Sequence, residues 1–130
     1  MLVSILRQRG HLIASIHEAL DDGEFMRFQA DLIEQIGVTR AAGIIIDVAA
    51  LDVIDSFGAR ALQHIARMAR LRGAETVVVG IQPMVALTLV RLGLLLEDLH
   101  TALDLEEGLE RLEGLLGSGR VNGARPVRDA

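Results

Sequence analysis

The 130-residue sequence contains no cysteine, lysine, tryptophan or tyrosine, and only three phenylalanines and two prolines. Without cysteine there is no disulfide, thiolate metal site or cysteine nucleophile. Without lysine there is no Schiff-base amine and no P-loop lysine to hold a nucleotide phosphate. The scarcity of aromatic rings argues against a single-stranded nucleic-acid binder, because such proteins usually stack bases on aromatic side chains.

Charge is distributed unevenly along the chain. Residues 1–116 carry ten arginines against seventeen acidic residues, a net charge of −7, whereas residues 117–130 carry three arginines against one aspartate, a net charge of +2. An acidic body lacks the positive face that binding to a phosphate backbone requires, so we expect no nucleic-acid partner. Its negative charge is typical of a solubilising surface.

The length is that of one ordinary domain, large enough to bury a core without disulfides or metals. The apolar stretch within residues 1–10 is too short for a signal peptide, and no uninterrupted apolar run approaches the length of a membrane span. We therefore expect a cytoplasmic protein without a membrane partner.

Apolar periodicity predicts the secondary structure. The predicted elements in chain order are strands over 2–6 and 11–17, a helix over 21–36 ended by Gly37, a strand over 43–48, a helix over 57–71, a strand over 76–81, a helix over 85–95 after Pro83, a short strand over 101–103 and a helix over 104–116. The two continuous aliphatic strands are typical of the middle of a mainly parallel sheet. We predict an α/β fold in a single domain over 1–116, with the order β-β-α-β-α-β-α-(β)-α, a mostly parallel central sheet of four to five strands and about four helices. Residues 117–130 show no periodicity and are predicted to form a flexible C-terminal tail.

The segment between the first aliphatic strand and the following helix carries the most information about function. It contains Asp52 and Asp55 and ends at Ser56, immediately before the predicted helix. Binding sites in open α/β sheets gather at the carboxyl ends of the strands, which is where this connection lies.

Ser56 has two interpretations. It could act only as the N-cap of the helix, stabilising the fold by about 1 kcal/mol. It could also accept a phosphate, which would add about −1.5 to −2 charges at the positive end of the helix. Arg60, His64 and Arg67 share one face of that helix by their spacing, either as a solvated surface or as cations that compensate the phosphate.

Other chemistry finds little support in the sequence. The four histidines show no metal-ligand spacing, and neither a glycine-rich phosphate loop nor a Gly-x-Ser-x-Gly elbow is present. Asp47 ends a buried strand, as the phosphorylated aspartate of receiver domains does, but the acidic pair and the lysine of that family are missing. We expect no catalytic residue, no metal and no cofactor; an enzymatic or nucleotide-binding α/β domain is the alternative of another class.

The segment Val53–Gly58, VIDSFG, resembles the STAS family (sulfate transporter and anti-sigma factor antagonist domains), in which an acidic loop is followed by Asp-Ser at a helix start. The segment Val77–Leu94 is similar to the family's later strand, proline-containing loop and helix. The bulky Phe57 after Asp-Ser resembles the short stressosome scaffold members of the family rather than its simple antagonists, which more often read Asp-Ser-Ser/Thr-Gly.

The resemblance implies a non-catalytic phosphoprotein that forms homo- and hetero-oligomers in a stressosome. It implies sequestration of a serine/threonine switch kinase (RsbT-type), phosphorylation at Ser56, a phosphatase that resets the protein, and sensor proteins with C-terminal STAS domains as further partners. The implied partner-binding residues are Asp52, Asp55, Ser56, Phe57, Gly58 and Arg60. A simple anti-sigma factor antagonist that binds one anti-sigma kinase is the alternative within the family.

Overall fold

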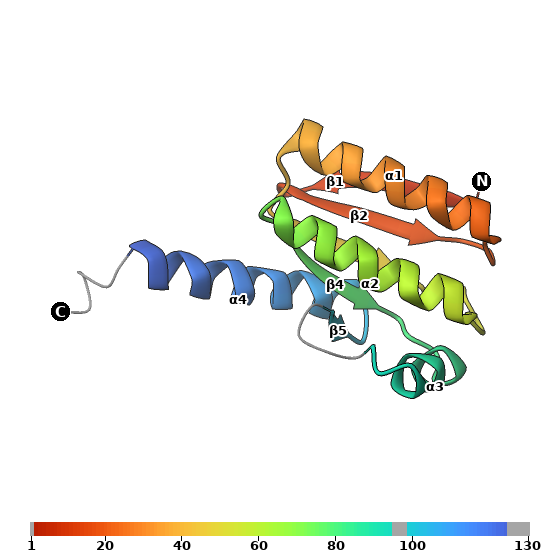
Figure 1. Ribbon diagram of the computed structural model, residues 1–130. Coiled ribbons are helices and arrows are strands. Elements are labelled where there is room, and N and C mark those ends of the chain that lie inside the picture. The colour runs from red at the N-terminus through yellow and green to blue at the C-terminus, as the bar shows by residue number, and fades with distance from the viewer. Residues whose placement is uncertain (1, 95–98, 125–130) are drawn as a thin grey trace.

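The computed structural model describes residues 2–94 and 99–124, and it describes the side chains of the last helix as far as Gly117. Five strands and four helices follow one another along these residues, beginning with two consecutive strands (Figure 1). Their bounds are β1 Val3–Gln8, β2 His11–Ile16, α1 Asp22–Thr39, β3 Gly43–Asp47, α2 Ser56–Leu71, β4 Glu75–Val79, α3 Pro83–Arg91, β5 His100–Ala102 and α4 Leu105–Ala124. The predicted element order is confirmed.

The five strands form one sheet in the order β1-β2-β3-β4-β5. Strand β1 runs antiparallel to β2, and the other neighbours are parallel, which confirms the mostly parallel sheet. A two-residue turn joins β1 to β2, with positive φ angles of 55° at Arg9 and 79° at Gly10. Two positive φ angles in succession match the right-handed twist of a hairpin, so this turn directs β2 back along β1.

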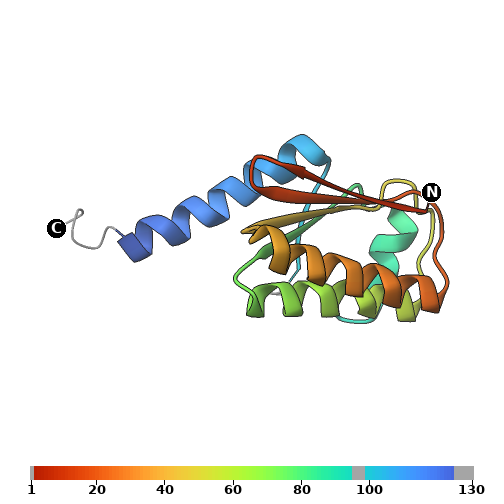
Figure 2. The same cartoon turned by 90° about the horizontal axis from the view of Figure 1, so that it is seen from above.

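The sheet is covered on both faces, and each face has its own apolar cluster. Helices α1 and α2 lie side by side on one face, and α4 crosses the other (Figure 2). The first cluster joins α1, α2 and α3 to alternate residues of the strands, such as Ile44 and Ile46 of β3. The second joins Ile45 and Val79 to Leu112 of α4. Strand β3 is therefore buried on both sides, as its continuous isoleucines predict.

Helix α4 approaches the sheet closely and then continues past it. A Cβ atom added at Gly108 would lie 2.7 Å from Cγ1 of Val79, so the glycine allows the helix backbone to rest on the sheet. The C-terminal part of α4, which ends at Ala124, extends past the edge of the sheet (Figures 1 and 2). None of the described helices combines the length and apolar character needed to cross a bilayer.

The predicted helix over 85–95 instead begins at Pro83 and ends at Arg91. Two other predicted helix ends fall short of the structure. Gly37 does not end α1, which continues to Thr39. The C-cap Arg40 adopts a left-handed conformation, and its N–H donates to the carbonyl of Ile36 over 2.8 Å. Helix α4 does not end at Leu116 but runs to Ala124. Periodicity could not place either end, because a glycine inside a helix costs only about 1 kcal/mol, which the rest of the helix can absorb. Residues 125–130 of the predicted flexible tail lie outside the described residues.

Candidate functional site

The candidate site is the connection between β3 and α2, at the carboxyl end of the sheet. Two buried side chains, Leu51 and Ile54, anchor this connection to the core. The amide of Val48 donates to the carbonyl of Val79 over 3.0 Å, and Nε2 of Gln82 donates to the carbonyl of Ala49 over 2.6 Å. The loop is therefore fixed to the neighbouring strand connection, and its remaining side chains are held outward.

The N-cap of α2 is Asp55, and the prediction that Ser56 caps the helix is wrong. Asp55 has extended backbone angles, and its Oδ1 accepts from the amide of Gly58 over 2.8 Å. Ser56 is the first residue of the helix itself. Aspartate and serine are comparably good caps, so two adjacent candidates could not be separated by residue type. The Ser56 hydroxyl therefore has no capping role.

Five of the six predicted partner-binding residues lie at the surface. The exposed residues are Asp52, Asp55, Ser56, Phe57 and Arg60. Gly58 is buried instead, and a Cβ atom added there would lie 2.6 Å from Cε2 of Phe25 on α1. Gly58 therefore allows close packing of α1 on α2 and takes no direct part in a partner surface.

Ser56 is more exposed than most of the other serines and threonines that could accept a phosphate. Among the serines and threonines whose exposure the structure describes, Ser56 and Thr101 are exposed, whereas Ser4, Ser15, Thr39, Thr76 and Thr88 are at least partly buried. Thr101 lies on the short edge strand β5. Of these two, Ser56 alone combines exposure with a position at a helix N-terminus, where the backbone favours a negative group.

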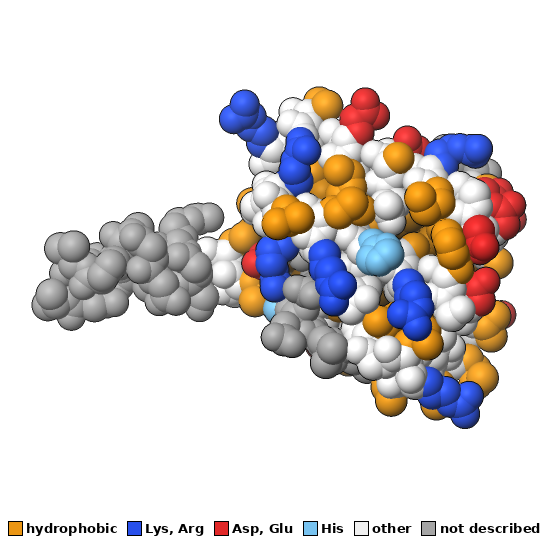
Figure 3. Space-filling model, viewed as in Figure 1, with side chains coloured by type: hydrophobic (Ala, Val, Ile, Leu, Met, Phe, Trp, Pro, Cys, Tyr) orange, Lys and Arg blue, Asp and Glu red, His pale blue; other side chains and the backbone are white. Residues whose placement is uncertain are grey.

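A row of basic side chains follows Ser56 along α2. Arg60, His64 and Arg67 are all exposed, and the space-filling view shows arginines and one histidine gathered over this helix (Figure 3). Arg60 lies one turn after Ser56 on the same face, and it has no ion-pair or hydrogen-bond partner within the part of the chain that the structure describes. It is therefore available to a negative group on Ser56.

Exposed apolar side chains beside the loop were missed by the sequence reasoning. Val53 in the loop is 60% exposed, and Met84 in the first turn of the neighbouring helix α3 is 54% exposed. Helix α3 packs against α2 and begins beside the loop, where Gln82 contacts Ala49. The nearly continuous aliphatic composition of α3 hid which of its residues face outward. Together with Phe57, these side chains give the site an apolar component suited to protein contact.

The capping geometry predicts different stabilities for two neighbouring substitutions. We expect Asp55→Ala to lower the free energy of unfolding by about 1 kcal/mol, because the amide of Gly58 loses its acceptor. We expect Ser56→Ala to change it by less than about 0.5 kcal/mol, as for most surface substitutions. Urea denaturation of both variants measures the difference, and a larger loss for Ser56→Ala would contradict the capping assignment.

The carboxylates near the site serve the local structure. Within the described residues, no three His, Asp or Glu side chains are placed to hold a metal ion. The carboxylate of Asp47 accepts from the amide of Ala49 over 2.9 Å and so serves the turn after β3. The site therefore presents the exposed residue Ser56 together with carboxylates, one nearby arginine and apolar side chains at the surface.

Comparison with known proteins agrees with this geometry. The family model described as the STAS domain matches residues 3–108. The chain belongs to the STAS domain family. Among curated proteins, RsbT co-antagonist protein RsbRA of Bacillus subtilis (strain 168) is 28% identical over 91 residues, which cover 70% of this chain and 33% of that protein. The chain thus spans about a third of the length of that relative.

Two solved structures are similar in both sequence and fold. A serine-to-glutamate variant of Moorella thermoacetica RsbS is 38% identical, with a TM-score of 0.79 and coverage of 88% of this chain and 97% of that one. A chain in a structure of the stressosome, which is described as a signal integration and transduction hub, is 39% identical to this chain. Its TM-score is 0.76, with coverage of 87% of this chain and 98% of that one. The anti-sigma factor antagonist SpoIIAA shares the fold, with a TM-score of 0.72 over 86% of this chain and 96% of that one, at 19% identity.

Proposed function

We propose that this STAS domain is a non-catalytic scaffold and antagonist of a partner-switching system, which sequesters a serine/threonine switch kinase until Ser56 is phosphorylated. The observation that carries the proposal is the exposed Ser56 hydroxyl in the first turn of α2, on a domain 38% identical to RsbS. The kinase is of the RsbT type, since the relative RsbRA is named as a co-antagonist of RsbT.

The switch acts through charge. The γ-phosphoryl group of ATP is transferred to Ser56, the hydroxyl proton is lost and ADP leaves. The phosphoserine then carries about −1.5 to −2 charges at the N-terminus of α2, where the helix dipole stabilises it. The fold therefore tolerates the modification. A partner docked against Asp52, Asp55 and Phe57 meets a new dianion beside two carboxylates, and its complex is weakened.

In this switch, Arg60 partly compensates the negative charge of the phosphate on Ser56. Because it lies four residues after Ser56 and has no other partner among the described residues, its guanidinium is placed to pair with the phosphate. A phosphatase that removes the phosphate restores the binding surface. The stressosome likeness at 39% identity favours an assembled scaffold, with sensor proteins that bear STAS domains, over a simple pair with one kinase. The likeness to SpoIIAA, at 19% identity, concerns the fold alone.

Phosphate mapping tests the site. We expect incubation with a switch kinase from the same genome and ATP to add one phosphate at Ser56, detected by mass spectrometry of the intact chain and its peptides. Ser56→Ala should abolish the incorporation. Thr101→Ala, which removes the other serine or threonine hydroxyl that is exposed among the residues of described burial, should leave it unchanged. Undiminished incorporation into the Ser56→Ala variant would place the acceptor elsewhere and overturn the proposal.

A further inference from the structure

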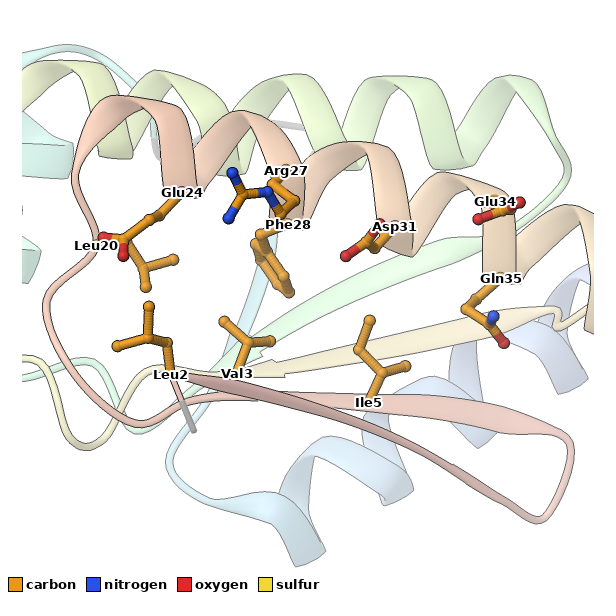
Figure 4. Close-up of a pocket in the computed structure, with 10 residues that line it drawn as sticks. All are labelled: Leu2, Val3, Ile5, Leu20, Glu24, Arg27, Phe28, Asp31, Glu34 and Gln35. Atoms are coloured by element: carbon orange, nitrogen blue, oxygen red, sulfur yellow. The ribbon is translucent and has the colours of Figure 1, made fainter.

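A second surface feature lies away from Ser56, between the edge strand β1 and helix α1. It is a groove with a volume of about 490 Å³ (Figure 4). Its floor is apolar: Leu2, Val3 and Ile5 point from the β1 side toward Phe28 of α1. The first three of these side chains are only partly buried, so the domain leaves apolar surface uncovered here.

The rim of the groove is acidic. Glu24, Asp31 and Glu34 line it from α1 against a single arginine, Arg27, which gives a net charge of −2. On its other side the groove is bounded by β1, which pairs with β2 alone within the described sheet. The outer edge of β1 therefore has backbone groups available to an incoming chain. An occupant should be basic and should carry a few apolar side chains.

The C-terminal segment of the chain has this composition. Residues 117–130 contain Arg120, Arg125 and Arg128 against Asp129, together with Val121 and Val127, and so carry +2 on a chain whose first 116 residues carry −7. The C-terminal part of helix α4, as far as Ala124, points away from the sheet of its own domain (Figures 1 and 2). Gly117, Gly119 and Gly123 give the end of α4 a low intrinsic helix propensity, so contact with another surface would stabilise it.

We propose that the groove between β1 and α1 binds residues 117–130 of a second copy of this chain. The groove and the segment are opposite in charge and equal in magnitude, and the direction of α4 disfavours insertion into the same molecule. The contact is head-to-tail, because one copy contributes its groove and the other its C-terminus. Such a contact leaves a free groove and a free segment at the ends, so it extends into rings or open chains.

Complementary charge reversal tests the proposal. The double variant Asp31→Arg/Glu34→Arg changes the net charge of the groove from −2 to +2. The double variant Arg125→Glu/Arg128→Glu changes the net charge of residues 117–130 from +2 to −2. Each double variant alone then has a groove and a segment of like charge. We expect self-association in sedimentation velocity to fall at least about tenfold for each. Mixing the two variants should restore association, because both new pairings are of opposite charge.

The matched control for the groove variant is the double variant Glu106→Arg/Glu110→Arg. It makes the same change in net charge as the groove variant, but on exposed residues of α4. This control should associate as the unchanged chain does, and circular dichroism should show that all variants are folded. An unchanged chain that stays monomeric, a groove variant that still associates, or a mixture that does not recover would each overturn the proposal. The measurement uses neither kinase nor ATP, so its outcome is independent of phosphorylation at Ser56.

Discussion

Ser56→Asp should weaken the complex with the switch kinase by about tenfold or more. A carboxylate in the first turn of α2 adds one negative charge beside the exposed Asp52 and Asp55. This is the surface that we propose the kinase covers. Burying a charge without a partner costs about 1 to 3 kcal/mol or more, and about 1.4 kcal/mol corresponds to a tenfold change in the dissociation constant. The effect should be smaller than that of phosphate, which carries about −1.5 to −2 charges.

Two variants separate charge from shape in this experiment. Ser56→Asn has nearly the same volume as the aspartate and no charge, so it should bind the kinase much as the unchanged chain does. Gln8→Glu adds the same charge at the exposed end of β1, at the opposite end of the sheet from the loop, and should also bind normally. Isothermal titration with each variant gives the dissociation constants. An unchanged value for Ser56→Asp, or an equal loss for Ser56→Asn, would count against an electrostatic switch.

Salt should reduce the loss caused by Ser56→Asp, because the interaction with neighbouring carboxylates is partly exposed to solvent. Between low and physiological ionic strength the Debye length falls to about 8 Å, and interactions between exposed charges weaken accordingly. Arg60→Gln should increase the loss, since the guanidinium one turn away no longer compensates the new carboxylate. These two trends distinguish a change in charge from a local change in shape.

The elements of the fold could be predicted because each has a strong local signal. The run from Ile44 to Ile46 indicates a strand buried on both faces, and all three side chains are fully buried. Asp21 predicts the start of α1, where its carboxylate and that of Glu24 form a reciprocal capping box. Such signals depend on neighbours within a few residues, so the sequence alone contains them.

Features that depend on contacts between distant segments could not be predicted. The groove between β1 and α1 exists because Val3 and Ile5 lie opposite Phe28, and nothing in the local sequence records that pairing. The outward side chains of α3 were missed for the same reason, since an aliphatic helix does not show which face the core takes. Ser56 was predicted as the N-cap but is the first residue of α2, because residue type alone does not decide between adjacent caps.

Gly58→Ala should destabilise the fold by about 1 to 3 kcal/mol, although alanine is the better helix former by about 1 kcal/mol. The new Cβ atom would lie 2.6 Å from Cε2 of Phe25 and 2.9 Å from Cγ1 of Ile54. Phe25 is only 2% exposed, so its ring cannot move aside without displacing the core. The resulting overlap exceeds the gain in helix propensity, and urea denaturation should show a lower free energy of unfolding.

Two other glycines provide matched controls for this substitution. Gly23 lies in the first turn of α1, where a Cβ atom would make only an ordinary contact of 3.5 Å with Oδ1 of Asp21, and Gly114 on α4 has nothing within 4 Å. Alanine at either position should leave the stability unchanged or raise it by up to about 1 kcal/mol. If Gly58→Ala behaves as these controls do, Phe25 is not packed against α2 as the structure has it.

A second substitution identifies the contact responsible. Phe25→Leu removes the ring atoms that the new Cβ would overlap, so Gly58→Ala should cost less in the Phe25→Leu background than alone. The coupling between the two changes, measured as a double-mutant cycle, should be at least about 0.5 kcal/mol, as expected for residues in contact. A purely additive result would mean that the glycine serves a partner surface rather than the packing of α1 on α2. In the structure, Gly58 places the first turn of α2 against Phe25, and that contact holds the exposed Ser56 at the edge of the sheet.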